Sequence, residues 1–97
     1  MFAETGIRET VIEEIIALAE KYQIEKVTLF GSRARGDYKE RSDIDLAVRG
    51  GDTTRFALDT EDVNTLLFFD VVDLNGPIQQ ELLESIEAEG KVLYEKI

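Results

Sequence analysis

Two short clusters in the first half of the chain carry residue types that could do chemistry. The Gly31-Ser32 pair directly follows an apolar run, and the Asp43-Ile44-Asp45 triplet opens another. Backbone N–H groups exposed at a glycine turn bind phosphate oxygens, and the serine hydroxyl adds a further donor. Taken alone, a Gly-Ser pair after a strand is usually an ordinary turn. A phosphate site here therefore needs support from elsewhere in the chain.

The aspartate pair has a spacing that places both carboxylates on one face of a strand. Residues i and i+2 of a strand share a face, so Asp43 and Asp45 would project side by side. Two carboxylates at such a short separation repel each other unless a cation or solvent lies between them. Mg²⁺ suits such a site, because it prefers oxygen ligands and commonly combines one or two carboxylates with substrate phosphates. The alternative is a solvated strand entrance, where Asp43 merely ends a loop.

The two clusters support each other through their separation. Ten residues lie between Ser32 and Asp43, enough for a turn and a return strand antiparallel to the first. Both clusters would then lie at one end of a sheet. A third acidic residue in a later apolar run, Asp70 or Asp73, would complete the parts of a two-metal displacement. One carboxylate would bridge two Mg²⁺ ions while another accepts a proton from an attacking hydroxyl, so no histidine is needed.

Of the two later aspartates, the sequence favours Asp70. It has two apolar residues on each side, and a carboxylate buried in such surroundings needs compensation, which a shared metal ion would supply. Asp73 lies close to the Asn75-Gly76-Pro77 turn, where a carboxylate can stay solvated. The two residues are three apart and so face opposite sides of a regular strand, although a β-bulge would reverse the choice.

Two arginines follow the Gly-Ser pair. Arg33 and Arg35 are candidates for neutralising the charge of a bound triphosphate. The alternative for each of them is a surface position, where the arginine only covers part of an acidic exterior. Charge reversal at Arg35 that leaves nucleotide affinity unchanged would favour this alternative.

Composition narrows the classes of function. The chain has 97 residues, 43% hydrophobic and 33% charged, which is typical of one globular domain spanning residues 1–97. It contains neither His nor Cys, which removes the usual general base, thiolate zinc sites and cysteine nucleophiles. The net charge of −10 argues against nucleic acid as a direct partner. No apolar run approaches the ~20 residues of a membrane span, and we expect a cytoplasmic protein.

The elements that must position the two clusters follow from the hydrophobic pattern. Strands are predicted over residues 26–30, 43–48, 66–74 and 91–97. Helices are predicted over residues 7–22, over 53–66 with a break near 59–60, over 77–90 with Pro77 in the first turn, and as one turn at 33–36. This order predicts an α/β (α+β) fold, in which helices pack on a small mixed sheet of about four strands.

Three motifs together resemble those of a known family. "FGSRARG", "SDIDL" and "FFDVVDL" are similar to the motifs of minimal nucleotidyltransferase domains in the DNA polymerase beta-like superfamily. The likeness covers nearly the whole chain. It implies a nucleotidyltransferase fold in which Gly31 and Ser32 hold the β- and γ-phosphates of ATP. It also implies that Asp43, Asp45 and a third aspartate bind Mg²⁺, and the distance to the closing "EGKVLY" favours Asp70 as the third.

The resemblance further implies a reaction and a partner. Small members of this superfamily pair with all-helical HEPN proteins, and as antitoxins they transfer AMP from ATP to a tyrosine of the HEPN toxin. We therefore expect a Mg²⁺-dependent protein adenylyltransferase in which Asp43, Asp45 and Asp70 are catalytic. The alternative is a non-catalytic nucleotide-binding or protein-binding module, which neutralises its partner through complex formation alone.

Overall fold

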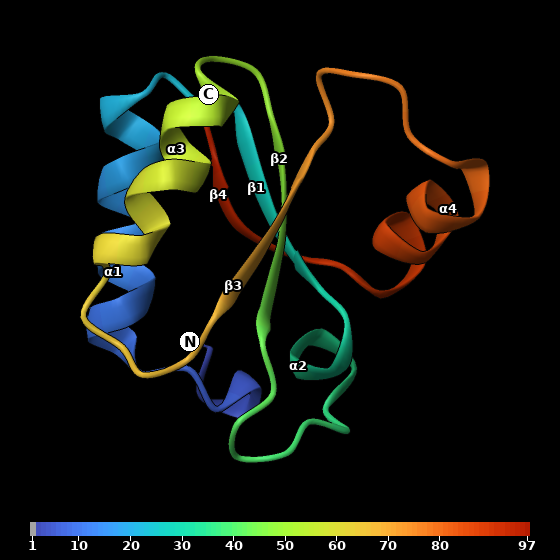
Figure 1. Ribbon diagram of the computed structural model, residues 1–97. Coiled ribbons are helices and arrows are strands. Elements are labelled where there is room, and N and C mark those ends of the chain that lie inside the picture. The colour runs from blue at the N-terminus through green and yellow to red at the C-terminus, as the bar shows by residue number, and fades with distance from the viewer. Residues whose placement is uncertain (1) are drawn as a thin grey trace.

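A four-stranded mixed sheet organises the structure, a computed structural model that describes residues 2–97 (Figure 1). The strands are β1 (Lys26–Phe30), β2 (Ile44–Arg49), β3 (Phe69–Asp73) and β4 (Lys91–Glu95). Their order in the sheet is β3-β2-β1-β4, so β3 and β4 are the two edges. β1 runs antiparallel to β2 and to β4, whereas β2 and β3 are parallel. The predicted mixed sheet is confirmed.

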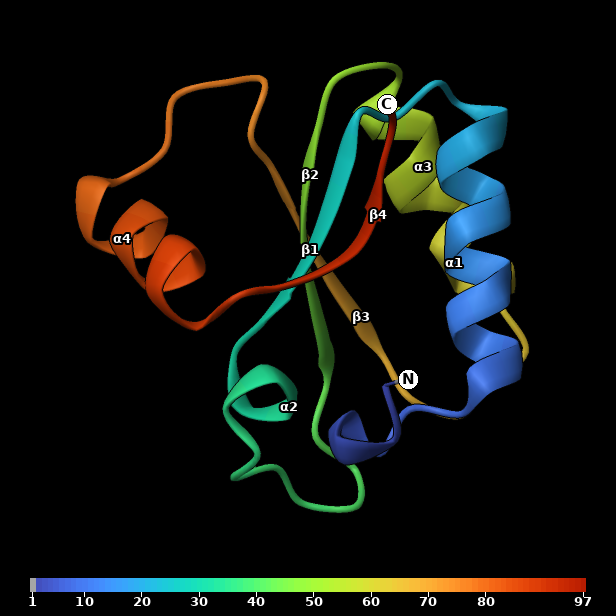
Figure 2. The same ribbon diagram turned by 180° about the vertical axis from the view of Figure 1, so that it is seen from behind.

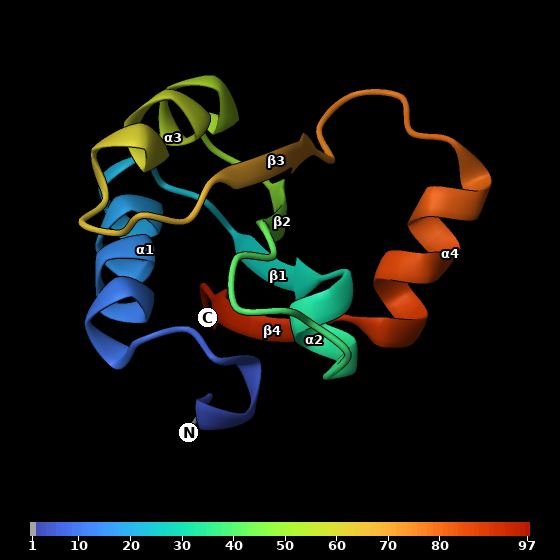
Figure 3. The ribbon, with the colours of Figure 1, turned by 60° about the horizontal axis from the view of Figure 1, so that its bottom comes forward.

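Helices cover both faces of this sheet. They are α1 (Glu9–Lys21), α2 (Ser32–Arg35), α3 (Thr53–Asp59) and α4 (Gln80–Glu89), with 3-10 turns η1 (Ala3–Thr5) and η2 (Thr60–Asp62). α1 and α3 lie side by side on one face, and the view from behind shows the same pair (Figures 1 and 2). α2 and α4 lie on the other face (Figure 3). Within residues 2–97, no helix is long and apolar enough to cross a membrane.

The core lies between the sheet and the α1–α3 face. Ile15 of α1 and Phe56 of α3 are completely buried there against the strands. In β2 the core residues alternate, as Ile44, Leu46 and Val48 are each 0% exposed. Successive side chains of a strand point to opposite faces, so Asp45 is directed to the α2–α4 face. Burial of each large apolar side chain contributes about 1.5–3 kcal/mol, which fixes this alternation and hence the side on which Asp45 lies.

Two predicted elements begin three residues later in the structure, and the helical segment predicted over 53–66 ends at Asp62. Pro77 does not open a helix, because α4 begins at Gln80 and its N-cap residue Gln79 is extended (φ −61°, ψ 137°). The residue before a proline also favours extended backbone, so the chain between β3 and α4 runs as a loop. The third strand begins at Phe69 instead of Leu66, and Leu66 is 94% exposed. Apolar composition alone therefore overestimated the length of both elements.

Candidate active site

Both sequence clusters lie at one end of the sheet. The register pairs Phe30 of β1 with Asp45 of β2, and Asp45 in turn with Asp70 of β3. Gly31 directly follows Phe30, and Asp43 immediately precedes β2. The antiparallel return strand predicted from the ten-residue gap is present, and it brings the Gly-Ser turn and the aspartates together.

Gly31 is in contact with the carboxylate of Asp45. Its φ of +73° and ψ of −158° lie in a region that is essentially restricted to glycine. A Cβ added at Gly31 would lie 2.3 Å from Oδ2 of Asp45, so the close approach also requires the absence of a side chain. The turn then enters α2, where the N–H groups of Ala34 and Arg35 donate to the carbonyl of Gly31. The glycine thus holds the Gly-Ser turn directly against an acidic side chain.

Three carboxylates share the electrostatic environment of this site. Asp45 is half-buried, and this burial is the main cause that raises its pKa. The negative charges of Asp70 and Asp43 raise the pKa of Asp45 further, while the positive charge of Arg35 opposes them. Asp43 and Asp70 are both exposed. Ionised Asp45 is therefore destabilised by its neighbours, and a bound cation would relieve this repulsion.

The donor set fits a hard divalent cation. Mg²⁺ is held by carboxylate oxygens together with water and substrate phosphates, and three aspartates beside a glycine turn supply donors of that kind. In residues 2–97, however, no group of three acidic side chains lies close enough to hold a metal ion. The carboxylates are neighbours that repel, and they do not form a closed ligand cage by themselves.

Asp73 lies away from the other aspartates. It pairs with Val48 at the far end of β2, and its Oδ1 accepts a hydrogen bond of 2.8 Å from the N–H of Asn75. The sequence-based preference for Asp70 beside Asp43 and Asp45 thus agrees with the geometry, but one of its premises is wrong. Asp70 is exposed, because β3 is an edge strand and not a buried one.

Arg33 has a structural environment that the sequence did not indicate. Its side chain is 2% exposed, which is incompatible with the surface position considered for it. Nε donates to the carbonyl of Ser42, and the two terminal nitrogens donate to the carbonyls of Thr5 and Glu40, each at 3.0 Å. The ring of Tyr38 lies 4.8 Å from the guanidinium carbon. Arg33 therefore ties α2 to the loop that leads into Asp43, and we do not include it among the phosphate-binding residues.

Arg35 remains accessible beside the aspartates. It forms ion pairs with Asp37 at 3.3 Å and with Glu89 of α4 at 3.2 Å, and its side chain is exposed. The hydrogen bond with Asp37 is the main cause that raises the pKa of Arg35. Glu89 is 54 positions away in the sequence, so no local pattern could have assigned it to this region.

Comparisons with known proteins identify relatives of this chain. Residues 13–97 match the family described as polymerase beta, nucleotidyltransferase. A Methanocaldococcus jannaschii protein with the provisional name of protein adenylyltransferase is 37% identical over 99 residues, which cover 89% of this chain and 97% of that protein. A second protein of that organism with the same provisional name is 43% identical over 42 residues, covering 43% of this chain and 49% of that protein.

Solved structures resemble the fold closely. A crystal structure of a toxin–antitoxin with AMP-PNP has a TM-score of 0.72 and 27% identity, and covers 88% of this chain and 73% of the solved chain. A mutant of the toxin–antitoxin MntA–HpeT has a TM-score of 0.71 and 25% identity over the same shares. Together with the sequence match over 13–97, this shows that the chain belongs to the polymerase beta nucleotidyltransferase family.

Proposed function

We propose that the protein is a Mg²⁺-dependent adenylyltransferase, which transfers AMP from ATP to a hydroxyl group of a partner protein. The observation that carries this proposal is the pairing of Asp45 with Asp70 beside the Gly31 turn. An acidic pair next to a turn suited to phosphate is the arrangement that nucleotidyl transfer requires. The ATP requirement fits the cytoplasmic location expected from the sequence.

Each residue of the site has a role in this reaction. Gly31 and Ser32 hold the β- and γ-phosphates through backbone N–H groups and the serine hydroxyl, and Arg35 offsets part of the phosphate charge. Asp43, Asp45 and Asp70 would hold Mg²⁺, which when bound neutralises the charge that develops on the triphosphate. We assign proton acceptance to Asp70, because it is exposed at the sheet edge, where an acceptor can approach.

The reaction is a displacement at the α-phosphorus. The oxygen of the acceptor hydroxyl attacks phosphorus while the bond to the β-phosphate oxygen breaks, and pyrophosphate leaves. The hydroxyl proton passes to a carboxylate. The product is AMP esterified to the hydroxyl group of the partner. We propose tyrosine of an all-helical HEPN toxin as the acceptor, which would make this protein its antitoxin. Two relatives named as protein adenylyltransferases and solved toxin–antitoxin structures support the proposal.

The aspartate pair receives specific support from one of these structures. The MntA–HpeT mutant replaces two aspartates, separated by one residue, with glutamate. Asp43 and Asp45 have the same separation in this chain. A longer side chain at such positions keeps the charge but moves the oxygens, so substitutions of this kind probe geometry and not charge alone.

The test is transfer of radioactive label from ATP. The protein is incubated with Mg²⁺, a purified HEPN protein from the same genome and ATP labelled at either the α- or the γ-phosphate. We expect the α-label on the HEPN protein, no γ-label, and loss of transfer with EDTA or with Asp45→Asn. Transfer of the γ-label would indicate a kinase instead. A tight complex without any transfer would favour the non-catalytic module.

A further inference from the structure

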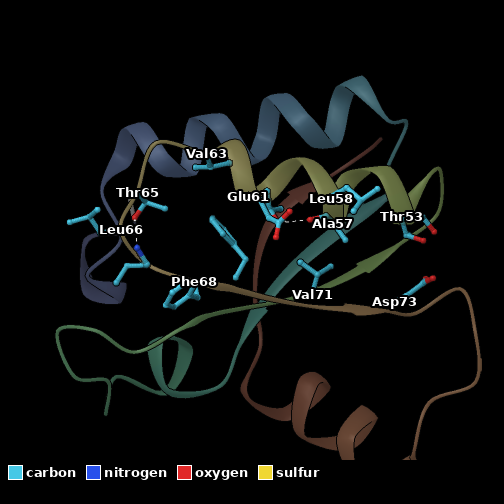
Figure 4. Close-up of a pocket in the computed structure, with 14 residues that line it drawn as sticks. Thr53, Ala57, Leu58, Glu61, Val63, Thr65, Leu66, Phe68, Val71 and Asp73 are labelled. Atoms are coloured by element: carbon cyan, nitrogen blue, oxygen red, sulfur yellow. Dashed lines mark hydrogen bonds between the residues drawn. The ribbon is translucent and has the colours of Figure 1, made fainter.

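A concave surface lies on the other side of the sheet from the Gly-Ser turn. It has a volume of about 830 Å³ and lies between α3 and the segment that leads into β3 (Figure 4). Three exposed apolar side chains line it, namely Leu58, Leu66 and Phe68, with exposures of 61%, 94% and 78%. We call this surface the α3–β3 groove. Single exposed apolar residues are ordinary, but three on one concave surface indicate a binding site.

The backbone of β3 is paired with β2 on one side only within residues 2–97. The carbonyl of Phe68 accepts from the N–H of Ile44, and the N–H of Leu74 donates to the carbonyl of Val48. Pairing along a parallel strand alternates, so the even-numbered residues of this strand face β2. The N–H and C=O groups of the odd-numbered residues therefore point away from the sheet at an open edge. Open strand edges are places where another chain can attach.

The charges of the groove select the kind of partner. Its two charged lining residues among residues 2–97 are Glu61 and Asp73, and both are acidic. The chain has a net charge of −10, so a second copy would bring two acidic grooves and two strongly negative chains together. A neighbouring hollow of about 470 Å³, which shares Leu66 and Phe68 with the groove, is lined by Arg8, Arg41 and Glu40 and so has mixed charge. The uniformly acidic lining is therefore on the α3 side.

We propose that the α3–β3 groove docks the partner protein through a segment that presents apolar side chains flanked by Lys or Arg. The position of the groove connects docking with catalysis. Phe68 is hydrogen-bonded to Ile44, which follows Asp43, and Asp70 is two residues further along the chain. The groove lies on the other face of the sheet from Asp70, so a segment bound over Phe68 would reach these two carboxylates around the open edge of β3. The use of the groove for an acceptor rests on the proposed function, whereas docking itself does not.

Docking is tested with a defined probe and no nucleotide. The probe is an amphipathic peptide of alternating Leu and Lys, whose extended form can pair with the edge of β3, and its counterpart of Leu and Glu is the charge control. We expect saturable binding of the Leu/Lys peptide, with NMR shift changes centred on Leu58, Leu66 and Phe68. Glu61→Gln should weaken this binding, while Glu84→Gln on the exposed part of α4 should not. Absent binding, equal binding of the Leu/Glu peptide, or shifts centred elsewhere would overturn the proposal.

A double variant tests the apolar contribution. Leu66→Ser with Phe68→Ser should weaken peptide binding by at least about 30-fold, as expected for the central apolar residues of an interface. Both side chains are exposed, so the fold should be retained, which circular dichroism checks. The matched control is Val92→Ser on the opposite sheet edge, 41% exposed, which should leave binding unchanged. A concentration-dependent dimer that the double variant abolishes would instead assign the groove to a second copy.

The two proposals can fail separately. If docking is correct and the proposed function is also correct, the double variant binds ATP and Mg²⁺ normally but no longer transfers AMP to the HEPN protein. If the unmodified protein binds the peptide at the groove but never binds ATP, the proposed function fails and docking stands. If the double variant transfers AMP to the HEPN protein as fast as the unmodified chain, the acceptor does not use the groove.

Discussion

Asp45 of β2 and Asp70 of β3 are direct register partners in the parallel pair of strands. Partners in register on adjacent strands point to the same face, and the strands are only about 4.8 Å apart. The two carboxylates are therefore held next to each other by backbone pairing, and Gly31 contacts Asp45 from the other neighbouring strand. The sheet, and not the local sequence, brings the acidic residues together.

This register leads to different expectations for Asp70 and Asp73. Asp70→Asn should reduce AMP transfer by at least about a hundredfold, because it removes one carboxylate from the proposed metal site. Asp73→Asn should retain most activity, since Asp73 lies at the far end of the strand and accepts a hydrogen bond from Asn75. Initial rates with α-labelled ATP measure both. The reverse pattern would assign the third carboxylate of the site to Asp73 instead of Asp70.

Stability should depend on pH through Asp45. Its pKa in the folded protein is raised above the ordinary value of 3.8, mainly by burial, so ionisation of this group disfavours the folded state. This cost is fully present above the raised pKa and disappears as pH falls below 3.8, where the group is protonated in both states. Without metal, Asp45→Asn should therefore be more stable than the unmodified chain at pH 7. The difference should shrink as the pH is lowered through this window.

Metal provides the control for that measurement. Mg²⁺ with ATP should stabilise the unmodified chain much more than Asp45→Asn, because a ligand that binds only the folded state stabilises that state. Urea denaturation of both proteins with and without Mg²⁺ and ATP measures this difference. If Mg²⁺ and ATP stabilise Asp45→Asn as much as they stabilise the unmodified chain, then Asp45 does not take part in the proposed site. If Asp45→Asn is the less stable protein at pH 7 without metal, the ionised carboxylate has favourable contacts that offset the repulsion.

Local patterns were sufficient for much of this fold. The apolar stripe of α1 and the short β-prone run of β1 predicted both elements, and the bounds of β1 agree to the residue. The ten-residue gap predicted the antiparallel return of β2. These features depend on side-chain periodicity and chain length, which a sequence displays directly. Asp43, which the sequence placed in the same strand as Asp45, immediately precedes β2 instead.

Features that depend on distant contacts could not be predicted. Whether "FFDVVDL" forms a central or an edge strand depends on strand order, so Asp70 was placed beside Asp45 correctly but was wrongly expected to be buried. The burial of Arg33 requires three carbonyl groups from other segments. An arginine after a Gly-Ser pair gives no local sign of such partners. The α3–β3 groove likewise forms only when α3 and β3 are brought together.

A pair of glycine variants separates backbone strain from contact with Asp45. Gly31 and Gly36 both have positive φ, at 73° and 93°, so alanine strains either position by roughly 1–3 kcal/mol. Only at Gly31 does the added Cβ meet Asp45, since nothing lies within 4 Å of it at Gly36. We expect Gly31→Ala to lose more stability than Gly36→Ala, because its Cβ also meets Asp45, and only Gly31→Ala to lose binding of ATP with Mg²⁺, as isothermal titration calorimetry can measure. Normal binding by Gly31→Ala would remove the turn from the site.

Substitution of Arg33 tests whether its role is structural. Arg33→Met keeps the apolar volume but leaves the carbonyls of Thr5, Glu40 and Ser42 without their donor, which should cost roughly 2–4 kcal/mol of stability. Arg33→Lys should recover only part of this loss, because an ammonium group cannot reproduce the planar fork of donors. The matched control is Arg41→Met, an exposed position in the same loop that should change stability by less than about 0.5 kcal/mol.

Urea denaturation measures these differences, and binding of ATP with Mg²⁺ tells which role is correct. Nε of Arg33 donates to the carbonyl of Ser42, which precedes Asp43. Arg33→Met should therefore loosen this loop and also weaken the binding of ATP with Mg²⁺. Arg33→Lys should then recover binding in proportion to the stability it recovers. If Arg33→Met is as stable as Arg41→Met and still loses ATP binding, the guanidinium contacts phosphate, as the sequence alone suggested. If neither property changes, water satisfies the three carbonyls equally well and the contacts of Arg33 are energetically neutral.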